Sequence, residues 1–439
     1  MKKVAYVFAI FICICALTGL GTSCNKNVFD IDIYDTLAEI KSPVDTVDPN
    51  HTWILSEKKT LKVNVNAGVG AKMLQILTDD PVVTTEATVL AQKSVRDGDQ
   101  FSINISYPQR LNTLYAALID ANGRYTISSF RPAFSNRVDF SNSIYQSQSL
   151  SYTPLPHYYA FCYEQEFPEF GDYDYNDVVM HIALDHSVEK IIKFHVRLAA
   201  VGADEPLAGA IRLPSIKMED IDSVYTENDK SFNVNMHGEE IAKQNMSVHT
   251  YRDLLLESKK GEPVLNLFAD AHWAMGDIRT NEYGVYSRKQ YNVAYGTTTT
   301  TTELMPREIT FAIKVKDDLV LNYLTLDDID PFIIRMYANN RREIHTFPYR
   351  TVDALYENKY VDIQNLPWAL VIPTGDFCHP LHGQNIGFRM KTDYNDYAEI
   401  LFGAYSYEGH SFGEWSVNRT KATDWYLKEY GTRGQIFMW

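Results

Sequence analysis

The chain has 439 residues, of which 45% are hydrophobic and 13% aromatic, so two globular domains are expected and wholesale disorder is excluded. Its formal net charge of −15 repels phosphate backbones, so nucleic acid is not an expected partner. The 29 tyrosines favour strands and suit surfaces that bind sugars or proteins, because each ring combines a flat apolar face with a polar tip.

The first 23 residues have the pattern of a secretory signal peptide. Lys2 and Lys3 precede an uncharged apolar run from Val4 to Leu20, and small residues stand directly before Cys24. This pattern resembles a bacterial lipoprotein signal, although Leu20 stands four residues before the cysteine instead of the usual three. The alternatives are an ordinary signal peptide or a single membrane anchor. We predict an outer-membrane lipoprotein, lipidated at Cys24 and facing the periplasm or exposed at the surface.

No other run of about eighteen apolar residues follows, so the mature chain is not expected to span a membrane. The mature chain is predicted to be mainly β: a small N-terminal β-sandwich, then a larger β-sandwich-like domain with a few helices. The predicted parts are a signal peptide (1–23), a lipidated tether (24–50), a β-sandwich spacer (51–135), a linker (136–156) and the larger β-domain (157–439).

Strands are predicted where apolar and polar residues alternate with a period of two. The predicted strands cover 61–65, 101–105, 114–119, 125–127, 178–184, 192–200, 265–269, 308–315, 332–336 and 368–372. Between two of them, Asn122 and Gly123 favour the tight turn of a hairpin. Helices are predicted over 87–95, 251–258 and 423–430. A further helix is predicted after Thr392, where apolar residues up to Tyr405 form a stripe along one face.

The densest group of oxygen ligands lies between residues 161 and 180. Acidic or amide side chains stand at alternate positions and at the end of one short loop: Asp172, Asp174, Asn176 and Asp177. In a turning loop this spacing directs the side chains at one centre, while Tyr173 and Tyr175 face away. Ca²⁺ takes about six to eight oxygen ligands in irregular geometry, so an acidic loop suits it. We predict that these four residues bind Ca²⁺ with help from Glu164.

The loop begins like an EF-hand loop but departs from that motif. Its sixth position should be Gly and is Asp177, and its twelfth should be Glu and is Ala183. A strand pattern over 178–184 replaces the exiting helix, so any calcium is held by a loop of a β-domain. The alternative is an acidic turn whose side chains bond local backbone amides. Clustered carboxylates without a cation are costly, which favours the ion.

Three further groups are weaker candidates. The segment 393–396 repeats the letters Asp-Tyr-Asn-Asp but is expected to begin a helix, where acids suit the helix dipole. Cys378, His379 and His382 have the types of metal ligands at close spacing, yet no second Cys or His pair stands at zinc-motif spacing. Asp270 and His272 could act as acid and base, but no nucleophile motif accompanies them, and no catalytic residue is assigned.

Two cysteines remain after Cys24 in the mature chain, Cys162 and Cys378. In an exported protein they could form a disulfide, but they are far apart in the sequence, and spacing alone does not show proximity. Two buried free thiols are the equal alternative.

Glu164 and the segment from Gly171 to Val179 resemble the LruC-domain family of exported lipoproteins, whose hallmark is Phe-Glu-Asp followed by Gly-Asp-x-Asp-Phe/Tyr-Asn-Asp. Other family-like pieces follow in the family's order, at 199–203, 330–333, 342–345, 365–369 and 424–426. The chain departs at Gln165, where an acid is usual, and at Cys378, where another residue is usual. The resemblance covers about 160–430 and implies an exported, membrane-tethered, cation-binding β-domain.

Together these features predict a non-enzymatic cell-envelope lipoprotein, stabilised by Ca²⁺, that contacts a glycan or protein partner in an adhesive or structural role at the surface. The alternative is a carbohydrate-active or cell-wall-modifying hydrolase that uses two of the clustered carboxylates. Such an enzyme would need a close pair of carboxylates lining an open cleft.

Overall fold

The computed structural model describes residues 42–44, 46–140, 147–167, 169–203, 205–227, 255–259, 261–275, 307–337, 340–346, 361–387, 389–390, 400–401 and 403–438. The predicted signal peptide and Cys24 lie outside these residues. The compact unit spans Ser42–Trp439 and is mainly antiparallel β-structure. Within the described ranges, no helix is both long enough and apolar enough to cross a membrane.

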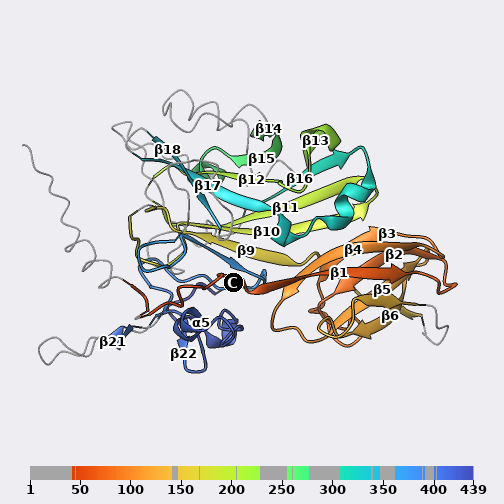
Figure 1. Cartoon of the computed structure of the whole chain (residues 1–439), viewed down its shortest axis with the longest axis horizontal. Coiled ribbons are helices and arrows are strands. Elements are labelled where there is room, and N and C mark those ends of the chain that lie inside the picture. The colour runs from red at the N-terminus through yellow and green to blue at the C-terminus, as the bar shows by residue number, and fades with distance from the viewer. Residues whose placement is uncertain are drawn as a thin grey trace, which may run out of the picture. The chain divides into compact units, whose positions relative to one another are not determined.

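Eight strands form a small N-terminal β-sandwich (Figure 1). They are β1 (Ser56–Asn64), β2 (Ala71–Leu77), β3 (Val89–Ser94), β4 (Gln100–Pro108), β5 (Leu114–Asp120), β6 (Arg124–Phe130), β7 (Arg137–Asp139) and β8 (Gln148–Ser149). One sheet has the order β4-β1-β7 and the other β3-β2-β5-β6-β8. Inward-facing residues of both sheets share one core, for example Leu61 and Ile103 from the first and Leu74 and Leu118 from the second. The alternating apolar and polar residues of these strands therefore face the core and the solvent in turn, as the sequence predicts.

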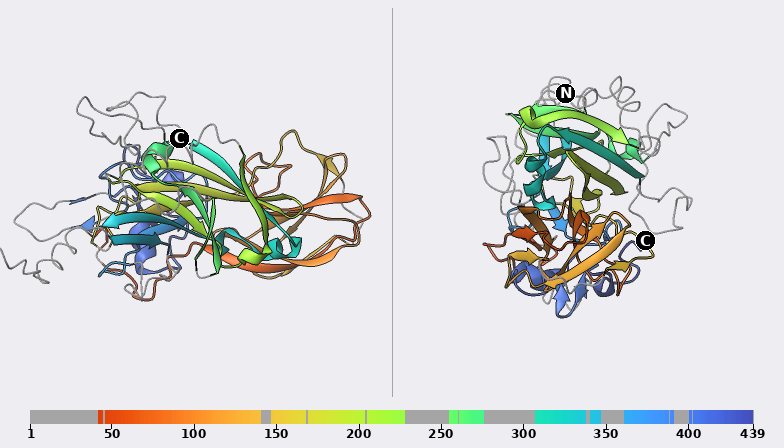
Figure 2. Two further views of the ribbon diagram at one scale, coloured as in Figure 1. Left: turned by 90° about the horizontal axis from the view of Figure 1, so that it is seen from above. Right: turned by 90° about the vertical axis from the view of Figure 1, so that its right-hand side faces the viewer.

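The larger β-structure consists of two sheets. The first has the order β13-β16-β11-β10-β9-β19 and contains β9 (Tyr158–Tyr163), β10 (Val178–Val188), β11 (Ile191–Val201), β13 (Ile221–Glu227), β16 (Arg307–Val315) and β19 (Ala369–Ile372). The second has the order β14-β15-β12-β17-β18 and contains β12 (Ala208–Arg212), β14 (Leu256–Lys259), β15 (Glu262–Phe268), β17 (Asp330–Tyr337) and β18 (Asn340–His345). The sheets pack face to face (Figure 2) around a core that contains Phe161, Phe194 and Ile333. The predicted mainly-β class is confirmed.

The outer face of the six-stranded sheet is also covered. There Cys162 and Val179 join a second buried cluster with aromatic residues of the C-terminal segment, such as Trp415 and Trp425. That segment contains β20 (Arg389–Met390), β21 (Ile400–Leu401), β22 (Ser406–Tyr407), β23 (His410–Ser411), the helix α5 (Phe412–Val417) and the 3-10 helix η7 (Lys428–Tyr430). Because β10 is covered on both faces, its first six residues are all buried, and a strand buried on both faces reads as a nearly continuous apolar run.

Two stretches predicted as connectors are structured where the chain is described. Val44, in the predicted tether, is buried in the second cluster, and the Asp48 N–H donates to the Ser416 carbonyl oxygen at 2.9 Å. In the predicted linker, β7 pairs with β1 and β8 pairs with β6. Both connectors therefore contribute backbone pairing to the fold.

The helix predictions are wrong wherever the structure describes them. Strand β3 replaces the helix predicted over 87–95, β14 occupies 256–259, β21 occupies 400–401, and turns followed by η7 replace the helix predicted over 423–430. Each of these strands is set by pairing with another strand, as Leu256 shows by pairing with Leu265. Pairing of this kind overrides weak local propensity. Two short helices, α4 (Ala271–Ala274) and α5, were not predicted.

Candidate metal centre

The acidic loop connects two neighbouring strands of the six-stranded sheet. Tyr163 at the end of β9 pairs with Val178 at the start of β10. Because the strands are antiparallel, Glu164 and Asp177 leave the sheet side by side, and the intervening residues must turn back between them. The register of one strand pair therefore brings the two ends of the acidic stretch together.

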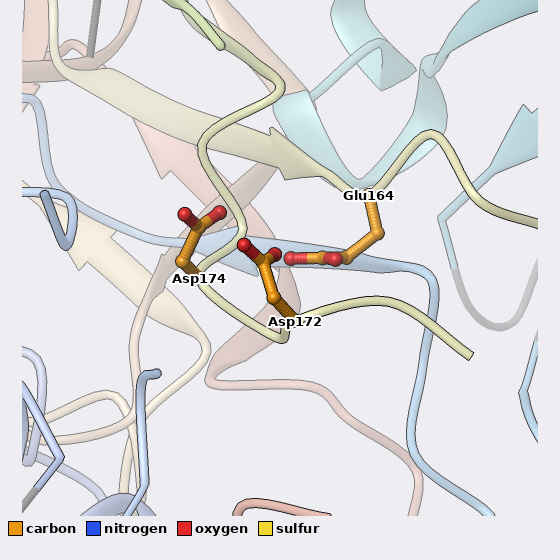
Figure 3. Close-up of side chains that lie close together, drawn as sticks. All are labelled: Glu164, Asp172 and Asp174. Carbon is orange, nitrogen blue, oxygen red and sulfur yellow. The ribbon is translucent and has the colours of Figure 1, made fainter. Parts of the chain in front are cut away.

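Five carboxylates converge in this loop. The ligand oxygens of Glu164, Asp172 and Asp174 lie within 4.8 Å of one another, and those of Glu164, Glu166 and Asp177 do the same. Glu164 belongs to both groups and joins them. Figure 3 shows the carboxylate of Asp172 between those of Glu164 and Asp174. The structure thus brings together the four carboxylates that the sequence nominates and adds Glu166.

The backbone of the loop cradles Glu164. Tyr173 and Tyr175 have φ angles of 57° and 50°, a left-handed conformation that is uncommon for bulky residues. In this conformation the N–H groups of both tyrosines donate to Glu164, from Tyr173 to Oε2 at 3.3 Å and from Tyr175 to Oε1. Both rings are buried in the second cluster, and the hydroxyls donate to Asp362 and to the Pro367 carbonyl oxygen. The tyrosines face away from the acids, as the alternation predicts.

Contacts from the C-terminal segment fix the rest of the loop. The side chain of Asp174 accepts the N–H of Gly383 at 2.9 Å and the N–H of Asn176 at 3.2 Å. The side-chain nitrogen of Asn176 donates to the Pro380 carbonyl oxygen at 2.9 Å. Both Asp174 and Asn176 are buried, whereas Asp172 is exposed. Asp172 is therefore the side of the cluster that faces solvent.

Burial and mutual repulsion dominate the electrostatics of the cluster. Burial raises the pKa of Glu164 well above its ordinary value, and the charges of Asp172, Asp174 and Asp177 raise it further. Burial likewise raises the pKa of Asp174 and Asp177, each with a contribution from neighbouring carboxylates. These shifts mean that the acids resist being ionised together unless a cation joins them.

Among the described residues, the guanidinium of Arg335 lies near the cluster. Its charge partly offsets the burial that raises the pKa of Glu166. However, this guanidinium forms an ion pair with Glu205 at 2.9 Å and donates to the Gln165 carbonyl oxygen at 2.7 Å. Among the described residues, the Glu166 Oε2 atom is buried and has no hydrogen-bond partner. Arg335 therefore does not balance the cluster.

The sequence missed Glu166 as a member of this group. Its signal was present, because it stands two residues after Glu164 in the same acidic run. The register of β9 against β10 decides that both side chains reach the same centre, and the sequence does not give that register.

The other candidate groups have different surroundings. Cys162 and Cys378 are both buried and form no disulfide, so the disulfide alternative is wrong. Within the described ranges, the acidic loop supplies both close groups of potential metal ligands, and Cys378 and His382 belong to neither. Asp270 and His272 are buried, and Asp270 accepts the His272 N–H at 2.8 Å. The repeat at 393–396 lies outside the described residues.

Two cavities, of about 480 and 380 Å³, are lined by described residues. The larger contains Arg110, His181, Arg197 and Tyr426 among its lining residues. The carboxylates of the acidic loop line neither cavity. The hydrolase alternative needs an open cleft lined by two of the clustered carboxylates. Neither cavity is such a cleft.

Comparison with known proteins gives two matches. Residues 189–406 match a family model described as a domain of unknown function, DUF4842. A solved structure described as a candidate lipoprotein from Bacteroides ovatus is similar over 84% of this chain and 99% of that chain, at 15% sequence identity and a TM-score of 0.49. No curated protein sequence matches the chain. The resemblance to the LruC-domain family stays a prediction.

Proposed function

We propose that this chain is a non-enzymatic lipoprotein of the cell envelope, anchored through Cys24, whose larger β-domain binds Ca²⁺ at the acidic loop. The anchor rests on the signal pattern that ends at Cys24. The proposed calcium site rests on the geometry of the acidic loop. The two parts of the proposal are independent and are tested separately.

The charge imbalance of the acidic loop is the observation that carries the calcium site. Five carboxylates lie together and four of them have a pKa raised by burial, while the neighbouring Arg335 is paired with Glu205. Isolated buried carboxylates cost several kcal/mol, on the order of the whole stability of a domain. A divalent cation removes this cost by binding the carboxylates directly.

The ligand types favour Ca²⁺ over other ions. All the grouped atoms are carboxylate oxygens, whereas zinc sites in proteins usually include sulfur or nitrogen ligands. Ca²⁺ tolerates irregular oxygen geometry, and Mg²⁺ demands a near-ideal octahedron. The exposed Asp172 gives the ion a path from solvent.

The ion would hold the C-terminal segment on the sheet. Asp174 and Asn176 bond to Gly383 and Pro380, and Tyr175 bonds to Pro367. Ca²⁺ at the loop would thus stabilise both the hairpin connection and the segment that covers the outer face. We assign the ion a structural role, and we place the contact with a glycan or protein partner on another surface of the tyrosine-rich chain.

Calorimetric titration of Ca²⁺ into the mature chain carrying Cys24→Ser tests the site. Within the described part of the chain, Asp172 makes no hydrogen bond or ion pair, so Asp172→Asn removes a ligand charge without removing a structural contact. We expect binding in the parent protein and at least a tenfold weaker affinity in Asp172→Asn, which is about 1.4 kcal/mol.

The matched control is Glu189→Gln, an exposed acid in the turn after β10, which should bind Ca²⁺ like the parent. No heat of binding in the parent, or equal affinity in Asp172→Asn and Glu189→Gln, contradicts the calcium site.

Fractionation of cells tests the anchor. The parent protein should sediment with membranes and Cys24→Ser should not. If Cys24→Ser stays in the membrane fraction, the chain is not held by a lipid on that cysteine.

A further inference from the structure

Three aromatic rings gather at the surface of the C-terminal segment. Tyr407 and His410 face each other across the hairpin of β22 and β23. Tyr430 of η7 stacks on His410 with ring centroids 3.9 Å apart, and its centroid lies 5.4 Å from that of Tyr407. The Asp424 carboxylate accepts a hydrogen bond from His410 Nδ1 at 2.8 Å. Tyr407 is therefore supported by neighbouring rings although 58% of its surface is exposed.

An exposed tyrosine ring that its neighbours hold in place is suited to binding. Its flat face is apolar and its hydroxyl is polar, and tyrosine is accordingly enriched where proteins bind partners. A ring that is already ordered loses little conformational freedom when a partner packs against it. Pyranose sugars offer the matching surface, because C–H groups form an apolar face on the sugar ring and hydroxyl groups surround it. Such a face packs on the aromatic ring while the hydroxyls reach polar side chains nearby.

A polar cavity of about 480 Å³ shares this part of the chain, because Leu427, Lys428 and Glu429 line it. Charged residues of both signs line the cavity: the basic Arg110, Arg197 and Lys428, and the acidic Glu86, Asp376 and Glu429. Among the described residues, Arg197 forms an ion pair with Glu308 at 3.0 Å, and the other five form none. Their charged groups therefore keep hydrogen-bonding capacity for a ligand.

The charges favour a neutral glycan over an acidic one. The arginine and lysine side chains of the cavity lining are matched by three acids, and Arg197 is already paired with Glu308. At the rings, desolvation raises the pKa of the Tyr430 hydroxyl, and the charges of Asp424 and Glu429 raise it further. These acids would repel a sugar carboxylate. Neutral sugar hydroxyls can instead donate to the carboxylates and accept from guanidinium and ammonium groups.

We propose that the three rings and this cavity together bind a neutral, β-1,4-linked oligosaccharide. One sugar packs on Tyr407, and its neighbours form hydrogen bonds with the charged lining of the cavity. Glu429 lines the cavity and the adjacent Tyr430 belongs to the rings, and a β-1,4-linked chain is extended, so one ligand can contact both. This inference deepens the partner contact of the proposed function by naming its place and its chemical class.

Calorimetric titration of hexasaccharides into the Cys24→Ser chain, with Ca²⁺ present, tests the proposal. The neutral probes are cellohexaose, chitohexaose and β-1,4-mannohexaose, and the β-1,4-mannuronate hexamer is the acidic counterpart of the last. We expect at least one neutral probe to bind, and the mannuronate hexamer to bind at least tenfold more weakly than that probe. Tyr407→Ala should weaken binding about tenfold, whereas Tyr407→Phe keeps the ring and should retain most of the affinity. Asp376→Ala should weaken binding from the cavity side.

Two matched controls separate this site from general effects of the substitutions. Tyr323→Ala removes a ring that is 50% exposed at the end of the 3-10 helix η4 (Asp318–Tyr323). Glu189→Ala removes an exposed acid in the turn after β10. Neither should change the affinity, and thermal unfolding shows whether each variant is folded.

Three outcomes would overturn the proposal. They are no binding of any neutral probe, tighter binding of the mannuronate hexamer than of the neutral probes, and equal affinity in Tyr407→Ala and Tyr323→Ala. The first outcome, with Ca²⁺ binding and membrane anchoring intact, would overturn this inference alone and would favour a protein partner.

Discussion

The carboxylate of Glu164 occupies the space in which a side chain at position 171 would lie. A Cβ atom on Gly171 would stand 2.2 Å from Glu164 Oε2 and 3.0 Å from Glu166 Oε2. Glu164 is itself held by the N–H groups of Tyr173 and Tyr175, so it is not free to move aside. Residue 171 must therefore be glycine, because the Glu164 and Glu166 carboxylates occupy the space that a Cβ atom would need.

Gly171→Ala should destabilise the protein and weaken Ca²⁺ binding. The added methyl group would displace Glu164 from the backbone cradle, and overpacking of this kind costs about 1–3 kcal/mol. Urea unfolding and calorimetric titration measure the two effects. Gly413→Ala is the control. Gly413 lies in the helix α5, and a Cβ atom there would stand 3.6 Å from its nearest neighbour, an ordinary van der Waals distance. Equal stability of the two variants would show that the close approach at Gly171 does not constrain the loop.

Stabilisation by Ca²⁺ should increase as the pH rises. Burial raises the pKa of Glu164, Asp174 and Asp177 in the folded chain. The metal-free folded state therefore binds more protons than the unfolded state above the ordinary carboxyl pKa of about 4, and it loses stability as the pH rises through the raised values. Ca²⁺ needs the ionised carboxylates, so it should restore this loss most at high pH.

Urea unfolding at pH 5 and 7.5, with Ca²⁺ or with a chelator, measures this linkage. With Ca²⁺ at ten times its dissociation constant, the gain should be about 1.4 kcal/mol. At one fixed Ca²⁺ concentration, the gain should be smaller at pH 5. A gain that is equal or larger at pH 5 would contradict a site built from carboxylates with raised pKa.

His157 should make the protein sensitive to mild acid. It is buried between Thr88 at 2.7 Å and the Pro373 carbonyl oxygen at 3.1 Å, and burial lowers its pKa to about 4. Its contribution is present above the unfolded pKa of about 6.5 and is lost as the pH falls toward 4, by about 3 kcal/mol in total. His157→Gln should flatten the pH dependence of stability over this range, whereas the exposed His382→Gln should leave the slope unchanged. An unaltered slope in His157→Gln would exclude this role.

The two remaining cysteines should be inert in the folded protein. Cys162 and Cys378 are buried and form no disulfide, and burial raises the pKa of the Cys162 thiol, which disfavours the reactive thiolate. A thiol reagent should label neither residue in the native Cys24→Ser chain and both after unfolding. Failure to label both after unfolding without a reductant would show that they form a disulfide. Labelling in the native state would show that they are accessible.

The sequence alone predicts the strands well and the helices poorly. Alternation along β1 and β4 follows from one buried and one solvent-facing side, and a single segment records it. The apolar spacing read as a helix over 87–95 instead serves β3, which pairs with β2. A local pattern does not contain the identity of its partner, so the pairing decides the outcome.

Some features of the acidic loop likewise follow from the sequence, and others only from the tertiary structure. The sequence by itself determined the ligand types, the alternate spacing of Asp172, Asp174 and Asn176, and the opposite direction of the tyrosines, because these depend on adjacent residues. Only the tertiary structure decided that Glu166 joins the group and that Gly383 and Pro380 hold the loop. Those contacts depend on strand register and on a segment about 200 residues away, and their energies arise from burial that exists only in the folded chain.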